Sequence, residues 1–565
     1  MENLNNITQY GRWSREFALE EGIEQVRFTA PSGQVSIRPT FLHQPGRFEY
    51  DQHGYEQLHP AGQPVSMARF TPKETGRYRF EALRAGQVVH MGSFESTASE
   101  HPGYVMVSPK DRRYFCFSNG QPYCAIGINL CGPAMYSLPQ GMEHFEIGQQ
   151  SASLGLHEYR RWFRLLAENG GNFTRIWLSN AYFQAETEEA GQVNPLRFNR
   201  LDGLIELARE YGIRLKLCFD HFRAFPTQQD RTVPVFVRRL RDPQTGREPL
   251  NVDDWLRDPL WQERWFEKVQ AYLARYGSDP TVMAWELWNE MDCVVTEQWE
   301  LVREWTRAML QRIKQHAPDQ LVVNSLGSFD DEAKLGVYAD FAQMAEMDFQ
   351  QVHRYLDQGA PWAICRSDPV AFSIDAIQRG QGKDRPTLLA ETGAVNDRHT
   401  GVFRYCRMDR RGIIFHDTTF PAFFAGAAGT GHNWFWDSYV DQKNLWGQLK
   451  PFAELVAGIA LDEEGFQPVD LSDEQAWCLG LAGNDTLLLW LRNRADTWEN
   501  VLRDEREVEA VSSSFPLGAL LPAHARLQVF ACWPEDLANA RLQDGILVID
   551  QLRSGLMVRI SSRAA

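Results

Sequence analysis

Residues 281–292 read TVMAWELWNEMD, and this stretch decides the fold that we expect for the chain. Thr281–Leu287 is a short apolar run that follows the turn cluster GSDP at residues 277–280. A run of this length between turn signals is typical of a strand that is buried on both faces. Polar residues then follow abruptly as Trp288-Asn289-Glu290, and such residues at the carboxyl end of a buried parallel strand line the mouth of an α/β barrel. The alternative is that Glu290 simply begins the next helix, where acidic residues are common.

Outward from this strand, apolar runs alternate with amphipathic stretches, which is typical of a parallel sheet with covering helices. The expected helices are Leu156–Glu168, Leu201–Tyr211, Trp261–Tyr276 and Val295–Gln315. The expected strands are Tyr123–Asn129, Asn172–Leu178, Ile213–Phe219, Thr281–Leu287, Leu321–Asn324, Asp348–Val352, Thr387–Ala390 and His432–Trp436. Eight strands in this alternation predict a (β/α)8 TIM barrel.

Short strands separated by turn signals lie on both sides of the barrel sequence, which predicts a multidomain α/β protein. We expect an N-terminal β-sandwich over residues 1–108, a catalytic barrel over 109–462 and a C-terminal β-sandwich, a small β-domain, over 463–565. No reactive cluster stands out in the first of these, so a packing domain is favoured over a carbohydrate-binding module.

Composition limits the classes of function. The 565 residues are 43% hydrophobic and 23% charged, as in ordinary globular proteins, and the net charge of −16 argues against nucleic acid and anionic membranes as partners. The sequence after Met1 lacks the pattern of a signal peptide, and no apolar run reaches membrane-spanning length, so a cytoplasmic location is expected. The nine cysteines are scattered without a metal-binding spacing, so we expect reduced thiols and neither metal nor cofactor.

Polar and aromatic residues lie within or at the ends of six predicted strands, the layout of a barrel active site. They are Arg175, His221, Asn289, Glu290, His353, Tyr355, Glu391, Trp434 and Trp436. Taken singly, the arginine also fits a buried ion pair, the histidines fit a satisfied core and the tryptophans fit barrel packing. His416 and Asp397, in the loops near strands seven and eight, are candidates for sugar contact or for plain solvation.

The ordered motifs WELWNE, VHRY and LLAETG, with the tryptophan-rich eighth strand, resemble those of retaining glycoside hydrolases that carry catalytic glutamates on strands four and seven. Glycoside hydrolase family 5 is the nearest group, together with family 5-like hydrolases that have an N-terminal β-sandwich of unknown function. The resemblance implies that Glu290 is the acid/base and Glu391 the nucleophile. It assigns supporting or substrate-binding roles to Arg175, His221, Asn289, His353, Tyr355 and a strand-eight tryptophan, Trp436 or Trp434.

The chemistry asks for the same residue types. A retaining glycosidase needs two carboxyl groups ~5–5.5 Å apart, one to attack the anomeric carbon and one to protonate the leaving oxygen. Arg175 and Tyr355 are suited to keep Glu391 ionised, because a cation and a hydroxyl donor favour the charged carboxylate. A less polar setting would instead keep Glu290 protonated.

We therefore expect a retaining β-glycoside hydrolase that acts on a carbohydrate substrate through a covalent glycosyl-enzyme. The inserts at Cys131–Gly155 and Asp220–Pro259 are long enough to enclose the site, which favours exo action on oligosaccharides or small β-glycosides. An endo-acting β-glucanase or β-mannanase and a transglycosylase remain alternatives, because they would use the same residues. A carbohydrate-binding protein on an inactive barrel is the non-enzymatic alternative, against which the presence of both glutamates argues.

Overall fold

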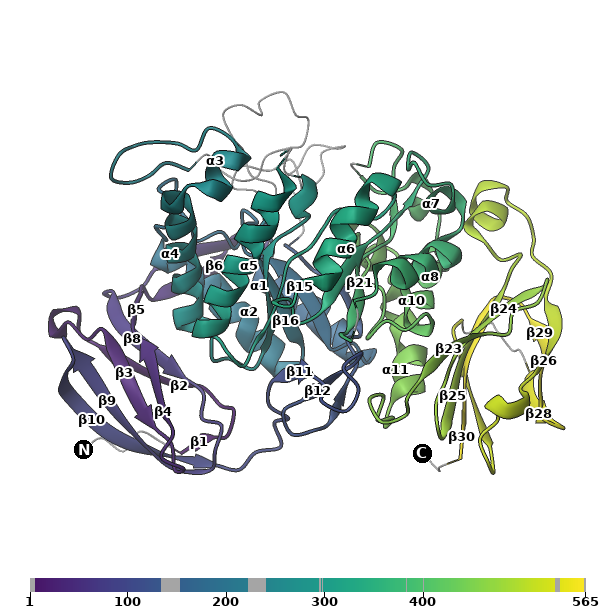
Figure 1. Cartoon of the computed structure of the whole chain (residues 1–565), viewed down its shortest axis with the longest axis horizontal. Helices are drawn as coiled ribbons and strands as arrows, with labels where there is room; N and C mark the ends of the chain where they lie inside the picture. Colours follow the sequence, from purple (N-terminus) through teal and green to yellow (C-terminus); the bar gives the residue numbers. More distant parts are fainter. Residues whose placement is uncertain are drawn as a thin grey trace.

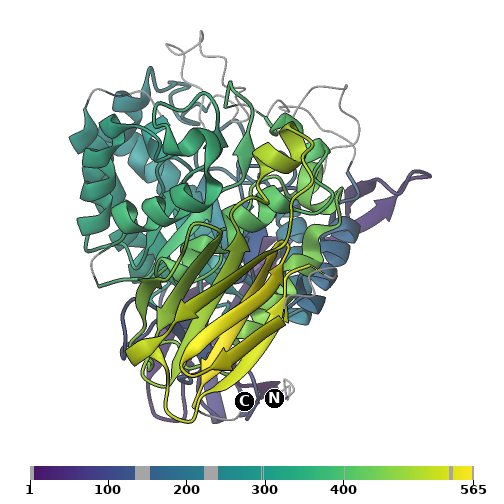
Figure 2. The same ribbon diagram turned by 90° about the vertical axis from the view of Figure 1, so that its right-hand side faces the viewer.

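The computed structural model describes residues 6–133, 153–221 and 240–562, apart from residues 294, 295, 297, 383, 400 and 534–538. A barrel occupies the centre of the molecule, and two β-rich parts lie on opposite sides of it (Figure 1). Turned by 90°, the C-terminal strands face the viewer in front of the barrel (Figure 2). Within the described ranges, no helix combines the length and the apolar character needed to cross a bilayer.

Two sheets of the N-terminal part enclose an aromatic core, and β6 and β7 form a separate two-stranded sheet. One has the order β1-β10-β9-β3-β4 and the other the order β2-β8-β5. Trp13, Phe28 and Phe80 are almost completely buried between them, because alternate residues of each strand face inward. The strands are β1 (Ile7–Thr8), β2 (Trp13–Phe17), β3 (Gln25–Thr29), β4 (Val35–Pro39), β5 (Phe41–His43), β6 (Gly46–Tyr50), β7 (Glu56–Pro60), β8 (Val65–Phe70), β9 (Gly76–Arg84) and β10 (Gln87–Thr97).

Several polar contacts fasten the N-terminal part to the barrel, among them those of Arg38 and Glu56. The Arg38 guanidinium on β4 donates to the carbonyls of Leu273 and His316 at 2.8 and 3.2 Å, and so satisfies groups at the ends of two barrel helices. In the β6–β7 hairpin, the Glu56 carboxylate accepts hydrogen bonds from Tyr182 Oη at 2.8 Å and from Arg200 Nε at 3.1 Å. The N-terminal part therefore helps to support the barrel.

Seven sides of the barrel are continuous strands, and every residue in them is buried. They are β14 (Gly127–Asn129), β15 (Phe173–Trp177), β16 (Arg214–Asp220), β17 (Val282–Trp288), β18 (Leu321–Val323), β19 (Gln350–His353) and β21 (Thr387–Glu391). The first five form one parallel sheet, and β19 pairs in parallel with β21. A hydrogen bond from Asp348 N to Val322 O, at 3.0 Å, links the two sheets.

The eighth side of the barrel differs from the predicted strand His432–Trp436. Single bridges at Gly429 and Asn433 join this segment to both neighbours, and Asn129 N donates to Asn433 O at 3.0 Å. The Asn433 side chain then accepts from Phe435 N at 3.1 Å, and such a local bond competes with a strand ladder. Trp436 accordingly begins a π-helical segment, Trp436–Asp441. The predicted (β/α)8 barrel is confirmed, but its last strand is short.

The predicted first strand, Tyr123–Asn129, divides into two. Tyr123 belongs to β13 (Pro122–Tyr123), which pairs antiparallel with β12 (Phe115–Phe117), and that strand pairs with β11 (Val105–Val107). Only β14 enters the barrel. Two further short strands, β20 (Leu356–Asp357) and β22 (Ala394–Val395), pair in parallel just beyond β19 and β21 and so extend this side of the barrel past the strand ends.

Helices cover the outside of the barrel. Tyr159, Trp162, Phe163 and Leu166 of α1 are buried, as the period of the sequence predicts. Asp258 caps α4 and Pro259 opens it, a favoured pairing at a helix start. The helices are α1 (Leu156–Glu168), α2 (Phe198–Glu210), α3 (Val252–Arg257), α4 (Pro259–Tyr276), α5 (Trp299–His316), α6 (Leu335–Gln343), α7 (Ile364–Ser367), α8 (Pro369–Gly380), α9 (Ile413–Thr419), α10 (Pro421–Phe424) and α11 (Lys450–Val456).

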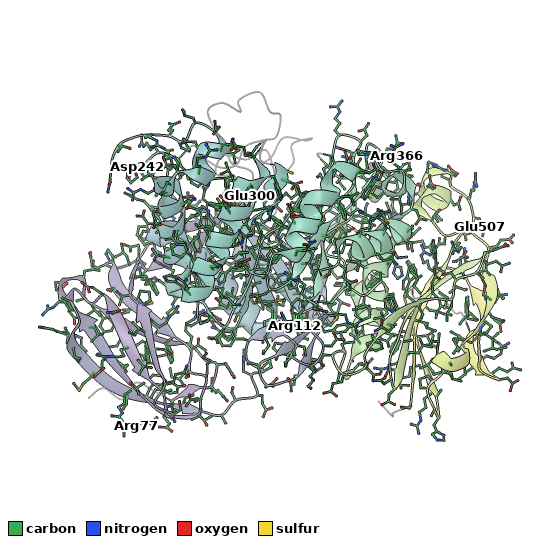
Figure 3. The ribbon with its side chains drawn as sticks, in the orientation of Figure 1. Arg77, Arg112, Asp242, Glu300, Arg366 and Glu507 are labelled. Carbon is green, nitrogen blue, oxygen red and sulfur yellow. The ribbon has the colours of Figure 1, made fainter. Side chains whose placement is uncertain are left out.

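The C-terminal part also consists of two sheets, with the orders β23-β24-β25-β30-β27 and β26-β29-β28. Figure 3 shows side chains filling the space between these sheets and the barrel, with Glu507 on the outer side. The strands are β23 (Gln467–Asp470), β24 (Ala476–Ala482), β25 (Thr486–Asn493), β26 (Val511–Pro516), β27 (Arg526–Ala531), β28 (Asn539–Gln543), β29 (Ile546–Leu552) and β30 (Gly555–Ser561).

A buried ion network joins the C-terminal part to the barrel. Arg492 on β25 contacts Asp417 of α9 at 2.8 Å and Asp496 at 2.6 Å. Arg411 also contacts Asp496, at 2.9 Å. Burial alone would raise the pKa of Asp496, but Arg492 and Arg411 hold it at about 2. His416 lies in this interface as well and accepts a 2.9 Å hydrogen bond from Trp490 Nε1, so it neither lies in solvent nor reaches a sugar site.

Candidate active site

Arg175 lies at the centre of the polar cluster inside the barrel. Arg175 lies on β15, which pairs in parallel with β16, and its side chain is fully buried. The guanidinium forms a fork with both oxygens of Glu286, at 2.7 Å each, and donates to Asn289 Oδ1 at 2.6 Å. Its remaining nitrogen contacts Glu391 Oε1. One arginine therefore fixes the amide and both acidic partners, since its planar donors hold a rigid geometry.

Glu391 ends β21 and faces Arg175 across the barrel interior. Arg175 contacts its Oε1, and the Tyr355 hydroxyl donates to its Oε2 at 2.7 Å. The residue is 3% exposed, so both bonds form in a nearly dry setting. A carboxylate that accepts from a guanidinium and a phenol is held in one orientation and is stabilised in its ionised form.

Glu290 follows β17 and has a different environment. Burial raises the pKa of Glu290, which keeps this carboxyl protonated to higher pH than an exposed one. Its backbone nitrogen donates to Ser325 Oγ at 3.0 Å, and its φ is +52°, in the left-handed region that non-glycine residues rarely adopt. Such a backbone is strained, and strain of this kind gathers at functional sites.

His353 connects the two glutamates. Its Nδ1 lies 3.0 Å from Glu290 Oε1 and 3.5 Å from Glu391 Oε2. Burial lowers the pKa of His353 to about 4, although Glu391 opposes this shift, so the ring is neutral near pH 7. Its Nε2 has no hydrogen-bond partner among the described residues, which places the single proton on Nδ1, between the carboxyl oxygens. One oxygen of each glutamate and a nitrogen of His353 all lie within 4.8 Å of one another.

Aromatic rings line the side of the cluster formed by β15, β16 and the eighth segment. Trp177 stacks on His221 with 4.3 Å between ring centroids and lies 4.7 Å from the ring of Trp434. Trp436 meets Trp434 edge-on at 5.3 Å. His221 is oriented by Ser179, whose Oγ lies 2.5 Å from Nδ1 of the ring. Flat apolar rings beside polar groups are suited to stacking against a pyranose ring.

Two groups of side chains within the described residues have ligand atoms close enough for a metal ion. The first is Glu290, His353 and Glu391 themselves, and the second is Asp330, Asp357 and His399 at the extension made by β20 and β22. In the first group, Arg175 already contacts Glu391, and a guanidinium opposes a divalent cation at the same oxygen. In the second, His399 Nδ1 and Asp357 Oδ2 bond each other at 2.8 Å.

The structure brings the nine predicted site residues to one end of the barrel, but sequence reasoning missed two that join them. Glu286 holds Arg175, and Trp177 packs between His221 and Trp434. A signal for Glu286 was available, since it is an acidic residue inside an apolar strand and two positions away from Trp288, on the same face. Trp288, left open by the sequence, is completely buried and packs edge-on against Trp305.

Comparison with known proteins agrees with this arrangement. The family described as cellulase (glycosyl hydrolase family 5) matches residues 139–414. Mannan endo-1,4-beta-mannosidase 4 of Oryza sativa subsp. japonica is 25% identical over 347 residues, which are 56% of this chain and 70% of that relative. Mannan endo-1,4-beta-mannosidase 7 of Arabidopsis thaliana is 26% identical over 306 residues, 49% of this chain and 65% of that relative.

A solved structure from Bacteroides vulgatus ATCC 8482, described as a candidate glycoside hydrolase, aligns with 99% of this chain and of its own, with a TM-score of 0.57 and 13% identity. At that identity the likeness concerns the fold, and it extends over the β-rich parts as well as the barrel. The family match and the mannosidase relatives indicate, beyond the fold, the class of enzyme. The chain thus has the barrel of a family 5-like glycoside hydrolase, and the protein is an enzyme of the glycoside hydrolase class.

Proposed function

We propose that the protein is a retaining β-glycoside hydrolase in which Glu391 is the nucleophile and Glu290 the acid/base. The observation that carries this proposal is the pair of unlike carboxyl groups whose nearest oxygens lie within 4.8 Å. Retaining glycosidases have carboxyl groups ~5–5.5 Å apart, whereas inverting ones need ~6.5–9.5 Å to admit a water molecule between base and sugar. The short separation favours direct attack by a carboxylate.

In the first step Glu391 attacks the anomeric carbon while Glu290 protonates the departing glycosidic oxygen. Arg175 and Tyr355 each contact one oxygen of Glu391 and so aim the carboxylate. Glu290 carries the proton, because burial raises its pKa. Neutral His353 accommodates both states, since its Nδ1 proton bonds either carboxyl without adding a charge.

In the second step Glu290 acts as a base. Its proton has left with the first product, and the negative charge of Glu391 has been consumed in the glycosyl ester. Glu290 therefore takes a proton from a water molecule, which attacks the anomeric carbon and releases the sugar with its original configuration. The ring of Trp434, which packs against Trp177, is the one that we propose stacks against the sugar during both steps.

For the substrate we propose a β-1,4-linked mannan or its oligosaccharides, cleaved internally. The names of the two plant relatives support this choice, and they favour the endo-acting alternative over the exo action that the sequence led us to expect. The expected enclosure depended on the inserts Cys131–Gly155 and Asp220–Pro259. Residues 134–152 and 222–239 of these inserts lie outside the described residues, so exo action stays a prediction without structural support.

The test is to incubate the enzyme with β-1,4-mannohexaose and with galactomannan. An endo-acting enzyme releases internal fragments and lowers viscosity early, whereas release of mannose alone would favour exo action. Longer oligosaccharides would reveal transglycosylation. Proton NMR of the first product should show the β-anomer, and an α-anomer would overturn the retaining mechanism. Glu391→Gln should lose at least about 10⁴-fold in turnover while folding normally, because it removes the nucleophile at constant volume.

A further inference from the structure

A lysine is buried inside the barrel beside Glu286. Lys216 on β16 is level with Arg175 on β15 and with Ala284 on β17, so its side chain shares the interior with the Arg175 fork. Its side chain is 0% exposed. Its Nζ lies 3.6 Å from Glu286 Oε2 and contacts the side-chain oxygen of Gln351 on β19. The sequence pattern does not single out this residue, and the proposed mechanism does not use it.

The ammonium group of Lys216 balances the charges of this buried cluster. Two cations, Arg175 and Lys216, face two carboxylates, Glu286 and Glu391, and the four side chains are at most 4% exposed. The other titratable groups around Lys216 are uncharged near pH 7: the histidines have pKa values of about 4 and about 3, and burial raises the pKa of each thiol well above its usual range. These groups are His353, His432, Cys131 and Cys218. The four charges therefore sum to zero only while Lys216 is an ammonium.

The titration of the two nearest groups agrees with this balance. Burial lowers the pKa of Lys216 to about 8, although Glu286 opposes the shift, so the ammonium form prevails at neutral pH. Burial alone would raise the pKa of Glu286, but Arg175 and then Lys216 overcome it and hold the value at about 2. If Lys216 only filled space, an apolar side chain at this position would cost less free energy, because taking an ion out of water is unfavourable.

We propose that Lys216 is a positioning residue for the reaction, whose ammonium neutralises the Glu286 side of the cluster and so lets Arg175 hold Glu391 as an ionised nucleophile. This inference rests on the proposed function. Without the ammonium, the cluster carries a net negative charge and takes up a proton at a higher pH than in the native enzyme. A proton on Glu391 blocks attack, and a proton on Glu286 loosens the fork that aims Arg175.

The test compares kcat/KM as a function of pH for the native enzyme, Lys216→Met and Lys216→Met/Glu286→Gln on the best mannan oligosaccharide. In Lys216→Met the acidic limb should move up by about one pH unit or more, as expected when a cation within a few ångströms of a carboxylate is lost. The double variant removes one charge of each sign, so its acidic limb should return toward the native position even if its rate is low. Leu215→Met, a neighbouring change that leaves the charges intact, should leave the limb in place.

A uniform loss of rate in Lys216→Met, with an unmoved pH profile, would overturn the proposal and leave Lys216 a packing residue. If Lys216→Met does not fold, Glu286→Gln alone decides, because a net positive cluster should move the acidic limb down. An unmoved limb in that variant would also overturn the proposal. A native enzyme without activity on any β-glycoside would instead contradict the proposed function, so the two failures are distinct.

Discussion

Replacing Tyr355 with phenylalanine isolates a single hydrogen bond at the proposed nucleophile. The Tyr355 hydroxyl donates to Glu391 Oε2 at 2.7 Å, and the ring is 4% exposed, so Tyr355→Phe removes the donor and little else. A hydrogen bond to a charged group contributes about 1.5–3 kcal/mol. If that contribution is lost from the transition state, kcat/KM should fall by about 10- to 150-fold, since each 1.36 kcal/mol is a factor of about ten.

The same bond fixes the sign of the pH effect. The hydroxyl favours the ionised carboxylate over the neutral acid, so its removal should move the acidic limb of the profile up by about one to two pH units. The assay is kcat/KM on an aryl β-mannobioside over a pH range that covers both limbs of the profile, with thermal unfolding measured in parallel. The alkaline limb should move less, because Glu290 keeps its own surroundings.

Tyr276→Phe is the matched control. Tyr276 is also fully buried and donates to a carboxylate, Asp202 Oδ1, at 2.9 Å, but it lies on α4 against the N-terminal part. It should lose stability without moving the pH profile. If Tyr355→Phe keeps the native rate and profile, then Tyr355 is a packing residue and the assignment of Glu391 loses one of its supports.

Two further predictions concern the acid/base and the domain interface. Glu290→Ala should still form the glycosyl-enzyme from substrates with activated leaving groups, and added azide should restore turnover as a β-glycosyl azide; an α-azide product would contradict the retaining mechanism. Asp496 has a pKa of about 2 in the folded protein, against about 3.9 unfolded, so its stabilisation is present above about pH 4 and is lost as the pH falls toward 2. The difference in Tm between the native protein and Asp496→Asn should therefore shrink over that range, and a difference that grows on acidification would refute the role of the ion network.

Much of the site could be predicted because its residues end strands. Asn289 and Glu290 follow an apolar run with turn signals before it, and Glu391 ends another, so the parallel order alone places them at one end of the barrel. The chemistry of each residue type then suggested its role. This reasoning needs only local sequence and the symmetry of the fold, and the two glutamates do lie close together in the structure.

The residues that were missed act inside the strands. Lys216 and Glu286 interrupt apolar runs, and a single polar residue in such a run does not reveal its partner. Their meaning depends on the register that sets Lys216 level with Arg175, and register is a property of pairing between strands far apart in sequence. The same limit applies to Trp436, because the strand ends early where the Asn433 side chain accepts a hydrogen bond from a backbone nitrogen.

The left-handed backbone at Glu290 also relates the stability of the barrel to its chemistry. A φ of +52° is free of strain for glycine and costs a side-chain-bearing residue roughly 1 kcal/mol. Glycine would relieve this strain, but it would also remove the carboxyl that lies 3.0 Å from Nδ1 of the buried His353. The barrel therefore carries a local cost in stability at the residue to which we assign the acid/base role.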